Sequence, residues 1–203
     1  SEANHGEGHW QPGWEIRAVD TSGVRVARGG LELLARPGDL ALAGDIGLQV
    51  GEVAGLWTGK DSLSLSPGYY TAMGDEPWRE QPAERIVRLY WDLTPAGAAV
   101  LVESLTSGLN RSKVPFSLKV VNHPDGFQRC DAGVLYLAEA DTAAAEDAVR
   151  SAYERVAALL GPGWPAFTKA LARGAQPGRG PGKRGELRPA SLAVARRGAH
   201  RRA

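Results

Sequence analysis

The sequence predicts an α+β fold: a strand-rich N-terminal part followed by the order β-α-β-β-α, with a mostly antiparallel sheet packed by helices. Two observations favour it. Short alternating or β-branched segments, separated by Gly, Asp and Pro, fill residues 14–60. After them come only two segments with helical periodicity, and they do not alternate regularly with the strands as they would in a doubly wound sheet.

The N-terminal part is expected to consist of short strands joined by tight turns. The segments WEIRAVD, GVRVAR, LELLA and IGLQVGEV predict strands at residues 14–20, 23–28, 31–35 and 46–53. The Ser-Pro-Gly within residues 64–75 predicts a turn that leads into an aromatic strand.

The second part carries the clearest periodicity. Thr94 and Pro95 are typical first residues of a helix, whereas Gly108 and Gly161 are typical of helix ends. The predicted elements are a strand at 85–93, a helix at 95–107, strands at 115–121 and 129–137, and a helix at 143–160.

Two cations, Lys119 and Arg129, fall inside the predicted β-hairpin of residues 116–137. Burying a cation in a sheet is costly unless an anion accompanies it. The nearby carboxylates of Asp125 and Asp131 are one source of that anion, and a bound ligand is the other.

The register of this hairpin stays open at the level of sequence. An odd-length loop would pair Lys119 with Arg129 and place both on one face of the sheet with Asp131. A four-residue His-Pro-Asp-Gly loop would instead pair Asn122 with Phe127, and Arg129 would then lie on the opposite face from Lys119.

Composition excludes several classes of protein. A single cysteine rules out an internal disulfide framework, and the four histidines are scattered without zinc-ligand spacing, so we expect neither a metal nor a cofactor. No phosphate-binding loop, dinucleotide fingerprint or nucleophile elbow occurs. Without an apolar run of membrane length or a secretory signal, the expected location is cytoplasmic, with no membrane partner.

Charge divides the chain into a domain over residues 1–172 and a tail over residues 173–203. The tail holds nine Lys or Arg and one Glu, whereas the domain has a formal charge of −7. Because the tail is rich in Gly and Pro, we expect it to be disordered. No aromatic residue interleaves its charges, so a nucleic-acid partner is not expected.

The segments SPGYYTAMGD, RLYWDL and PFSLKVVNHPDGFQRCDAGVLYL resemble the HopA-type effector domain family over roughly residues 4–172. The resemblance implies a lyase that works with a separate peptide kinase in lanthipeptide and thioamitide maturation. Such a lyase eliminates phosphate from phosphoserine or phosphothreonine in a precursor peptide. Longer family members carry an N-terminal helical region and a C-terminal Ser-Phe-Gly-x-His-Arg-Cys stretch, and this chain has the basic tail in place of the latter.

Elimination needs a base, an acid and a cationic cradle for phosphate. On the resemblance and by residue type, we expect the base to be Lys119 and the acid His123. The expected phosphate and substrate contacts are Arg129, Arg88, Lys60, Lys113, Tyr69, Tyr90 and Asp131. The alternative is a non-catalytic module that binds a peptide or a kinase, in a truncated and inactive family member.

Overall fold

The structure is a computed structural model that describes residues 1–44, 47–78, 85–163, 169–170 and 192–196. The chain divides into two compact units, one formed by Glu7–Lys60 and the other by Ser1–Gly6 together with Asp61–Ala203. The first unit contains an antiparallel sheet, and the second an antiparallel sheet with two α-helices. The α+β prediction is therefore confirmed.

The unit of Glu7–Lys60 is a five-stranded antiparallel sheet in the order β3-β2-β1-β5-β4. Its strands are β1 (Gly8–Asp20), β2 (Gly23–Arg28), β3 (Leu31–Ala35), β4 (Leu40–Leu42) and β5 (Val53–Gly59). A small core forms on one face from Trp14, Ile16, Val24, Val26 and Ala35.

Three of the four strands expected in this unit are confirmed, and the fourth is misplaced. Residues 14–20, 23–28 and 31–35 lie in β1, β2 and β3. The strand expected at 46–53 is wrong, because residues 47–52 lie outside any strand, with a turn at residues 50–51, and β5 begins only at Val53. Gly51 supplies the reason, since its φ of +92° reverses the chain in a conformation that glycine adopts most readily.

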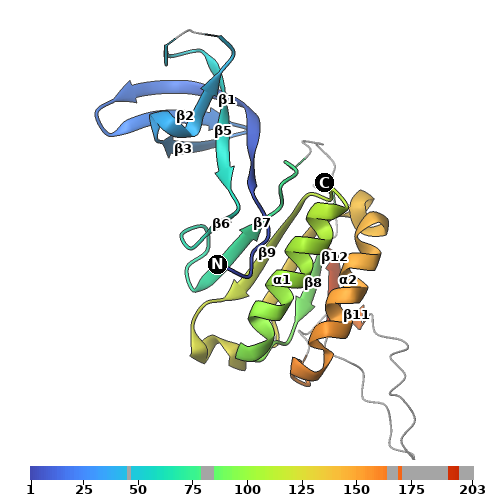
Figure 1. The fold of residues 1–203 in the computed structure, drawn as a ribbon. Helices are drawn as coiled ribbons and strands as arrows, with labels where there is room; N and C mark the ends of the chain where they lie inside the picture. The colour runs from blue at the N-terminus through green and yellow to red at the C-terminus, as the bar shows by residue number, and fades with distance from the viewer. Residues whose placement is uncertain (45–46, 79–84, 164–168, 171–191, 197–203) are drawn as a thin grey trace, which may run out of the picture. The chain divides into compact units, whose positions relative to one another are not determined.

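The other unit is built on a seven-stranded antiparallel sheet in the order β11-β12-β8-β10-β9-β7-β6. Figure 1 shows helices α1 (Pro95–Arg111) and α2 (Thr142–Val156) side by side against this sheet. The strands are β6 (Asp61–Ser62), β7 (Tyr69–Met73), β8 (Ile86–Trp91), β9 (Phe116–Val121), β10 (Gly133–Ala138), β11 (Lys169–Ala170) and β12 (Leu192–Arg196).

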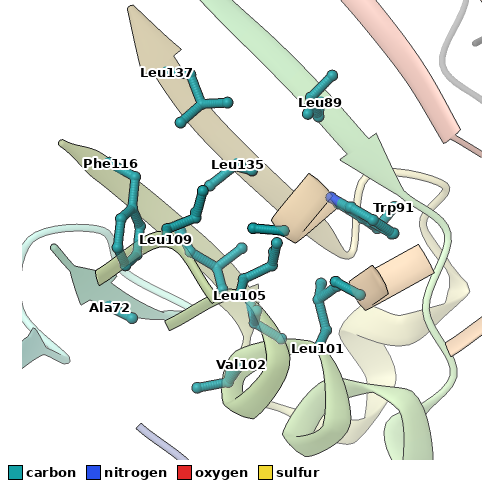
Figure 2. Packing of buried hydrophobic residues seen from close by; sticks show 14 of the residues in the cluster. Ala72, Leu89, Trp91, Leu101, Val102, Leu105, Leu109, Phe116, Leu135 and Leu137 are labelled. Atoms are coloured by element: carbon teal, nitrogen blue, oxygen red, sulfur yellow. The ribbon is translucent and has the colours of Figure 1, made fainter. Parts of the chain in front are cut away.

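The core of this unit lies between the helices and one face of the sheet. Alternate strand residues such as Leu89, Leu118 and Leu135 meet an apolar stripe along α1, as Figure 2 shows for part of the cluster. The largest fully buried side chains here are Trp91, Leu93, Leu101, Leu105, Leu109, Phe116, Leu118, Leu135 and Leu137. Every second strand residue therefore points away from the helices.

The predicted helix ends differ from the observed ones. Helix α1 continues through Gly108 to Arg111. Gly108 does not end the helix and instead allows close packing against α2, since a Cβ at position 108 would lie 2.8 Å from that of Ala148. Helix α2 ends at Val156 instead of residue 160. The backbone of Leu159 is needed elsewhere, since its carbonyl accepts hydrogen bonds from the Thr94 amide (3.0 Å) and hydroxyl (2.9 Å).

Part of the basic tail departs from the expectation of disorder. Leu192–Arg196 form β12, which pairs antiparallel with β8. Without this partner, β8 would present unpaired amides and carbonyls at a sheet edge, so strand addition there satisfies both segments. The remainder of the predicted tail, and the domain boundary at residue 172, lie outside the described residues. No helix in the described part of the chain is long and apolar enough to cross a membrane.

Candidate functional site

The hairpin of residues 116–137 has neither of the two registers considered from the sequence. Lys119 of β9 pairs with Val134 of β10, so both predicted registers are wrong. Strand β10 starts at Gly133, four residues later than expected, because a short 3₁₀ helix at Pro124–Gln128 occupies the connection. Proline has no amide hydrogen to give to a strand ladder, and Asp-Gly favours turns.

Arg129 is consequently not a buried strand residue. It precedes β10 with its side chain 57% exposed, and it forms an ion pair with Asp131. Its Nε and Nη2 each donate at 2.8 Å to separate oxygens of that carboxylate. The bidentate contact with Arg129 lowers the pKa of Asp131 and raises that of Arg129. The guanidinium fork is therefore already occupied.

The face of the large sheet that points away from the helices, called here the cation face, carries four of the other predicted site residues: Lys119, Arg88, Tyr69 and Tyr90. Strand register places its side chains in rows. One row runs Thr71, Lys119, Val134, Tyr90, and the next runs Met73, Ser117, Tyr136, Arg88. Residues from β7, β8, β9 and β10 that are far apart in the sequence thus become neighbours.

Tyr136 lies between two cations at the centre of this face. The Arg88 Cζ is 5.4 Å from its ring centroid, and the Lys119 Nζ is 5.5 Å from the same centroid. The Lys119 ammonium donates a hydrogen bond of 2.7 Å to Ser66 Oγ. Among the described residues, no carboxylate pairs with Arg88 or Lys119. Arg88 and Lys119 are therefore two cations that no carboxylate of the described residues pairs with.

Two further tyrosines add hydroxyl groups to the cation face. Partial burial raises the pKa of both Tyr69 and Tyr90, so both phenols remain protonated well above neutral pH. Tyr69 also lies under Arg129, whose Cζ is 5.9 Å from the ring centroid. The tyrosines can therefore donate hydrogen bonds to an anion near the two unpaired cations.

The remaining three predicted site residues are placed elsewhere. His123 has a side chain 68% exposed, and its Nδ1 lies 3.6 Å from a carboxylate oxygen of Asp125. Lys60 is the last residue of the Glu7–Lys60 unit. Lys113 follows the end of α1 with a φ of +53°. Among the described residues, neither His123 nor Lys113 contacts Tyr136, and the roles of all three residues stay predictions.

Lys113 has a local structural explanation. Its amide donates to the Asn110 carbonyl, and the Val114 amide donates to the Leu109 carbonyl, each at 3.0 Å. This pair of bonds around a residue in the left-handed conformation is the Schellman motif that ends many helices. The backbone conformation at Lys113 therefore serves to terminate α1.

Sequence reasoning missed Tyr136, Ser66 and Thr71. The first was within reach, because the alternation of Val-Leu-Tyr-Leu places Tyr136 on the opposite face from Leu135 and Leu137. Ser66 and Thr71 had no such signal, since their proximity to Lys119 depends on strand pairing. Within the described residues, no group of three or more His, Cys, Asp or Glu could hold a metal ion.

Comparison with known proteins adds the family. A family model described as the HopA1 effector protein family matches residues 60–188, which is more than half of the chain. The chain belongs to the HopA1 effector protein family. Among solved structures, it is similar to the effector protein from Pseudomonas syringae pv. tomato strain DC3000, at 17% identity and a TM-score of 0.46. That likeness covers 66% of this chain and 48% of the other, so this chain spans about half of its length. No curated protein matches.

Proposed function

We propose that this HopA1 family member is a phosphoserine or phosphothreonine lyase that acts on a precursor peptide phosphorylated by a separate kinase. One observation carries the proposal: Arg88 and Lys119 flank Tyr136 on the cation face, and no carboxylate in the described structure neutralises either. Unpaired cations partly withdrawn from water favour binding of an anion. A phosphate monoester has the charge and the acceptor oxygens to fill this site.

Phosphate binding follows from the chemistry of the two cations. The planar fork of Arg88 can bind two phosphate oxygens, and Lys119 supplies a compact charge to the same group. The protonated hydroxyls of Tyr69 and Tyr90 are suitable further donors. Because Asp131 already holds the fork of Arg129, we assign the cradle to Arg88 and not to Arg129.

The elimination breaks two bonds, Cα–H and Cβ–O, and forms two, the second Cα–Cβ bond and an N–H bond on Lys119. We assign Lys119 two successive roles: it binds the phosphate as an ammonium, and the fraction of it that has lost its proton to solvent removes the proton from Cα of the phosphorylated residue. The electron pair of the Cα–H bond becomes the new Cα–Cβ double bond, and the Cβ–O bond breaks. Phosphate leaves with that electron pair, held by Arg88. The products are a dehydroamino acid in the peptide, inorganic phosphate and a protonated Lys119.

The test is turnover of a phosphothreonine peptide, followed by mass spectrometry of the dehydrobutyrine product and by release of inorganic phosphate. Lys119→Met keeps side-chain length and removes the amine, so turnover should be lost while circular dichroism stays unchanged. Lys113→Met is the matched control, because that lysine ends α1 and makes no contact with the cation face among the described residues. Retained turnover in Lys119→Met would refute the assigned base.

Binding separates the proposed enzyme from the non-catalytic alternative. Arg88→Lys should weaken phosphopeptide binding, since an ammonium cannot replace a bidentate fork. If the parent chain binds the phosphopeptide and never eliminates phosphate, the binding module is the correct reading. If the parent binds no phosphopeptide, both readings fail.

A further inference from the structure

Thr71 on β7 is a buried hydroxyl without a hydrogen-bond partner. Its side chain is 2% exposed, and its Oγ1 contacts no donor or acceptor in the described structure. A buried polar group left unpaired costs about 1–3 kcal/mol. Thr71 pairs with Lys119 in register, so the two side chains are neighbours on the cation face. The unused hydroxyl therefore lies beside a cation of the proposed phosphate site.

The segment of residues 62–68, called here the serine loop, contains a residue next to Thr71 and a residue bonded to Lys119. Ser62 of β6 is the register partner of Thr71 on one side. On the other side, Ser66 Oγ accepts the hydrogen bond of 2.7 Å from Lys119. The loop therefore has one residue beside Thr71, on β6, and another bonded to Lys119, the register partner of Thr71 on β9.

The serine loop is held weakly by its side chains. Leu63 and Leu65 are 66% and 61% exposed, so they give the loop little apolar anchoring. Among the described residues, the Ser62 hydroxyl bonds within the loop: it accepts from the amides of Ser64 and Leu65 and shares a hydrogen bond with the Ser64 hydroxyl. Among the described residues, two long-range hydrogen bonds hold the loop: the one between Ser66 and Lys119 (2.7 Å), and a backbone bond of 3.2 Å from the Asn122 amide to the Gly68 carbonyl.

We propose that the serine loop is a cover which the phosphate of the substrate displaces, and that Thr71 then donates a hydrogen bond to that phosphate. The inference rests on the proposed function and adds how the site would distinguish a phosphorylated residue from an unphosphorylated one, through the serine loop and Thr71. A phosphate monoester replaces the neutral Ser66 hydroxyl at Lys119 with a charge-assisted contact. An unphosphorylated serine or threonine offers Lys119 only a second hydroxyl, so it gains nothing by opening the loop.

The experiment measures two quantities in full-length variants: stability without ligand, and affinity for a phosphothreonine peptide by calorimetry. Thr71→Val keeps the shape and removes the unpaired hydroxyl, so the protein should become more stable while the peptide binds about tenfold more weakly. Ser66→Ala frees Lys119 from its internal partner and should tighten binding roughly twofold to tenfold. Ser64→Ala is the matched control and should bind like the parent, because within the described part of the chain the Ser64 hydroxyl bonds to Ser62 alone. The unphosphorylated peptide should bind none of these proteins.

Thr71→Val is expected to raise stability and to weaken phosphopeptide binding, and a purely structural role of Thr71 would not produce these opposite changes. If Thr71→Val is more stable and binds the phosphopeptide with parent affinity, Thr71 is only an unpaired core hydroxyl and the inference is wrong. If Ser66→Ala weakens binding, Ser66 is a ligand to the substrate and not a cover. Turnover of the phosphothreonine peptide, assayed in the same samples, distinguishes the two proposals. If the parent eliminates phosphate but all variants bind the phosphopeptide with parent affinity, only the inference about the loop and Thr71 is wrong. If the affinities change as predicted but no phosphate is eliminated, only the proposed lyase activity is wrong. Absence of phosphopeptide binding by the parent overturns both.

Discussion

The two faces of the seven-stranded sheet use the same strands for opposite purposes. On the helix side, β8, β9 and β10 present Trp91, Leu118 and Leu135, all with side chains that are fully buried. On the cation face, the same strands present Arg88, Lys119 and Tyr136. Two helices cover one face. The other face brings two cations together, and among the described residues no carboxylate pairs with either of them.

The difference shows that the residues which stabilise this unit and the residues proposed to bind substrate lie on opposite faces of the same sheet. Apolar packing on the helix side supplies the favourable free energy of folding. The cation face can then retain groups that add little or nothing to stability, such as the unpaired Thr71 hydroxyl. Alternation along a strand makes this separation possible, because adjacent residues face different environments.

The largest expected effect comes from the helix side. Leu135→Ala removes a fully buried side chain and should lower the free energy of unfolding by about 2–5 kcal/mol. Tyr136→Ala, one residue along β10, removes a larger side chain that is only partly buried and should cost less. Urea unfolding of both variants measures the comparison. Equal losses would show that the cation face is packed as firmly as the core.

A smaller effect is expected at the end of α1. Lys113 holds a φ of +53°, where a Cβ is disfavoured, so Lys113→Gly should raise the unfolding free energy by about 1 kcal/mol. Lys113→Ala retains the Cβ and serves as control, with no such gain. Phosphopeptide affinity should be the same in all three proteins. A loss of affinity in both variants would place this lysine in the binding site, against the position assigned to it here.

The smallest effect concerns the exposed ion pair. Arg129 lowers the pKa of Asp131 below its usual 3.8, so the pair stabilises the fold at neutral pH and loses that contribution as pH falls through the lowered pKa. Because both side chains are partly exposed, Asp131→Asn should cost less than about 1 kcal/mol at pH 7. The difference between parent and variant, followed by urea unfolding from pH 7 to pH 2, should shrink toward zero. A difference independent of pH would contradict this origin.

Most elements of the second unit could be predicted because their signals are local. The alternation of Ile-Val-Arg-Leu-Tyr-Trp predicts β8, and the apolar stripe after Thr142 predicts α2. The predicted start of β10 is too early, because the sequence pattern assigns Arg129 and Cys130 to the strand. In the structure these residues follow the 3₁₀ helix of Pro124–Gln128 and precede the strand. The misplaced start also shifted the register on which the predicted site depended.

The sequence by itself determined which residues share a face of each strand, because side-chain alternation is a property of the local backbone. It also indicated Asp131 as an ion-pair partner for Arg129, because the two residues are only two positions apart. Only the tertiary structure decided which cations remain without an anion. Lys119 meets Ser66 across 53 residues of sequence, and Arg88 meets Tyr136 through the pairing of β8 with β10. Register is set by the packing of whole strands and turns, so contacts of this kind have no signal in any short segment of the chain.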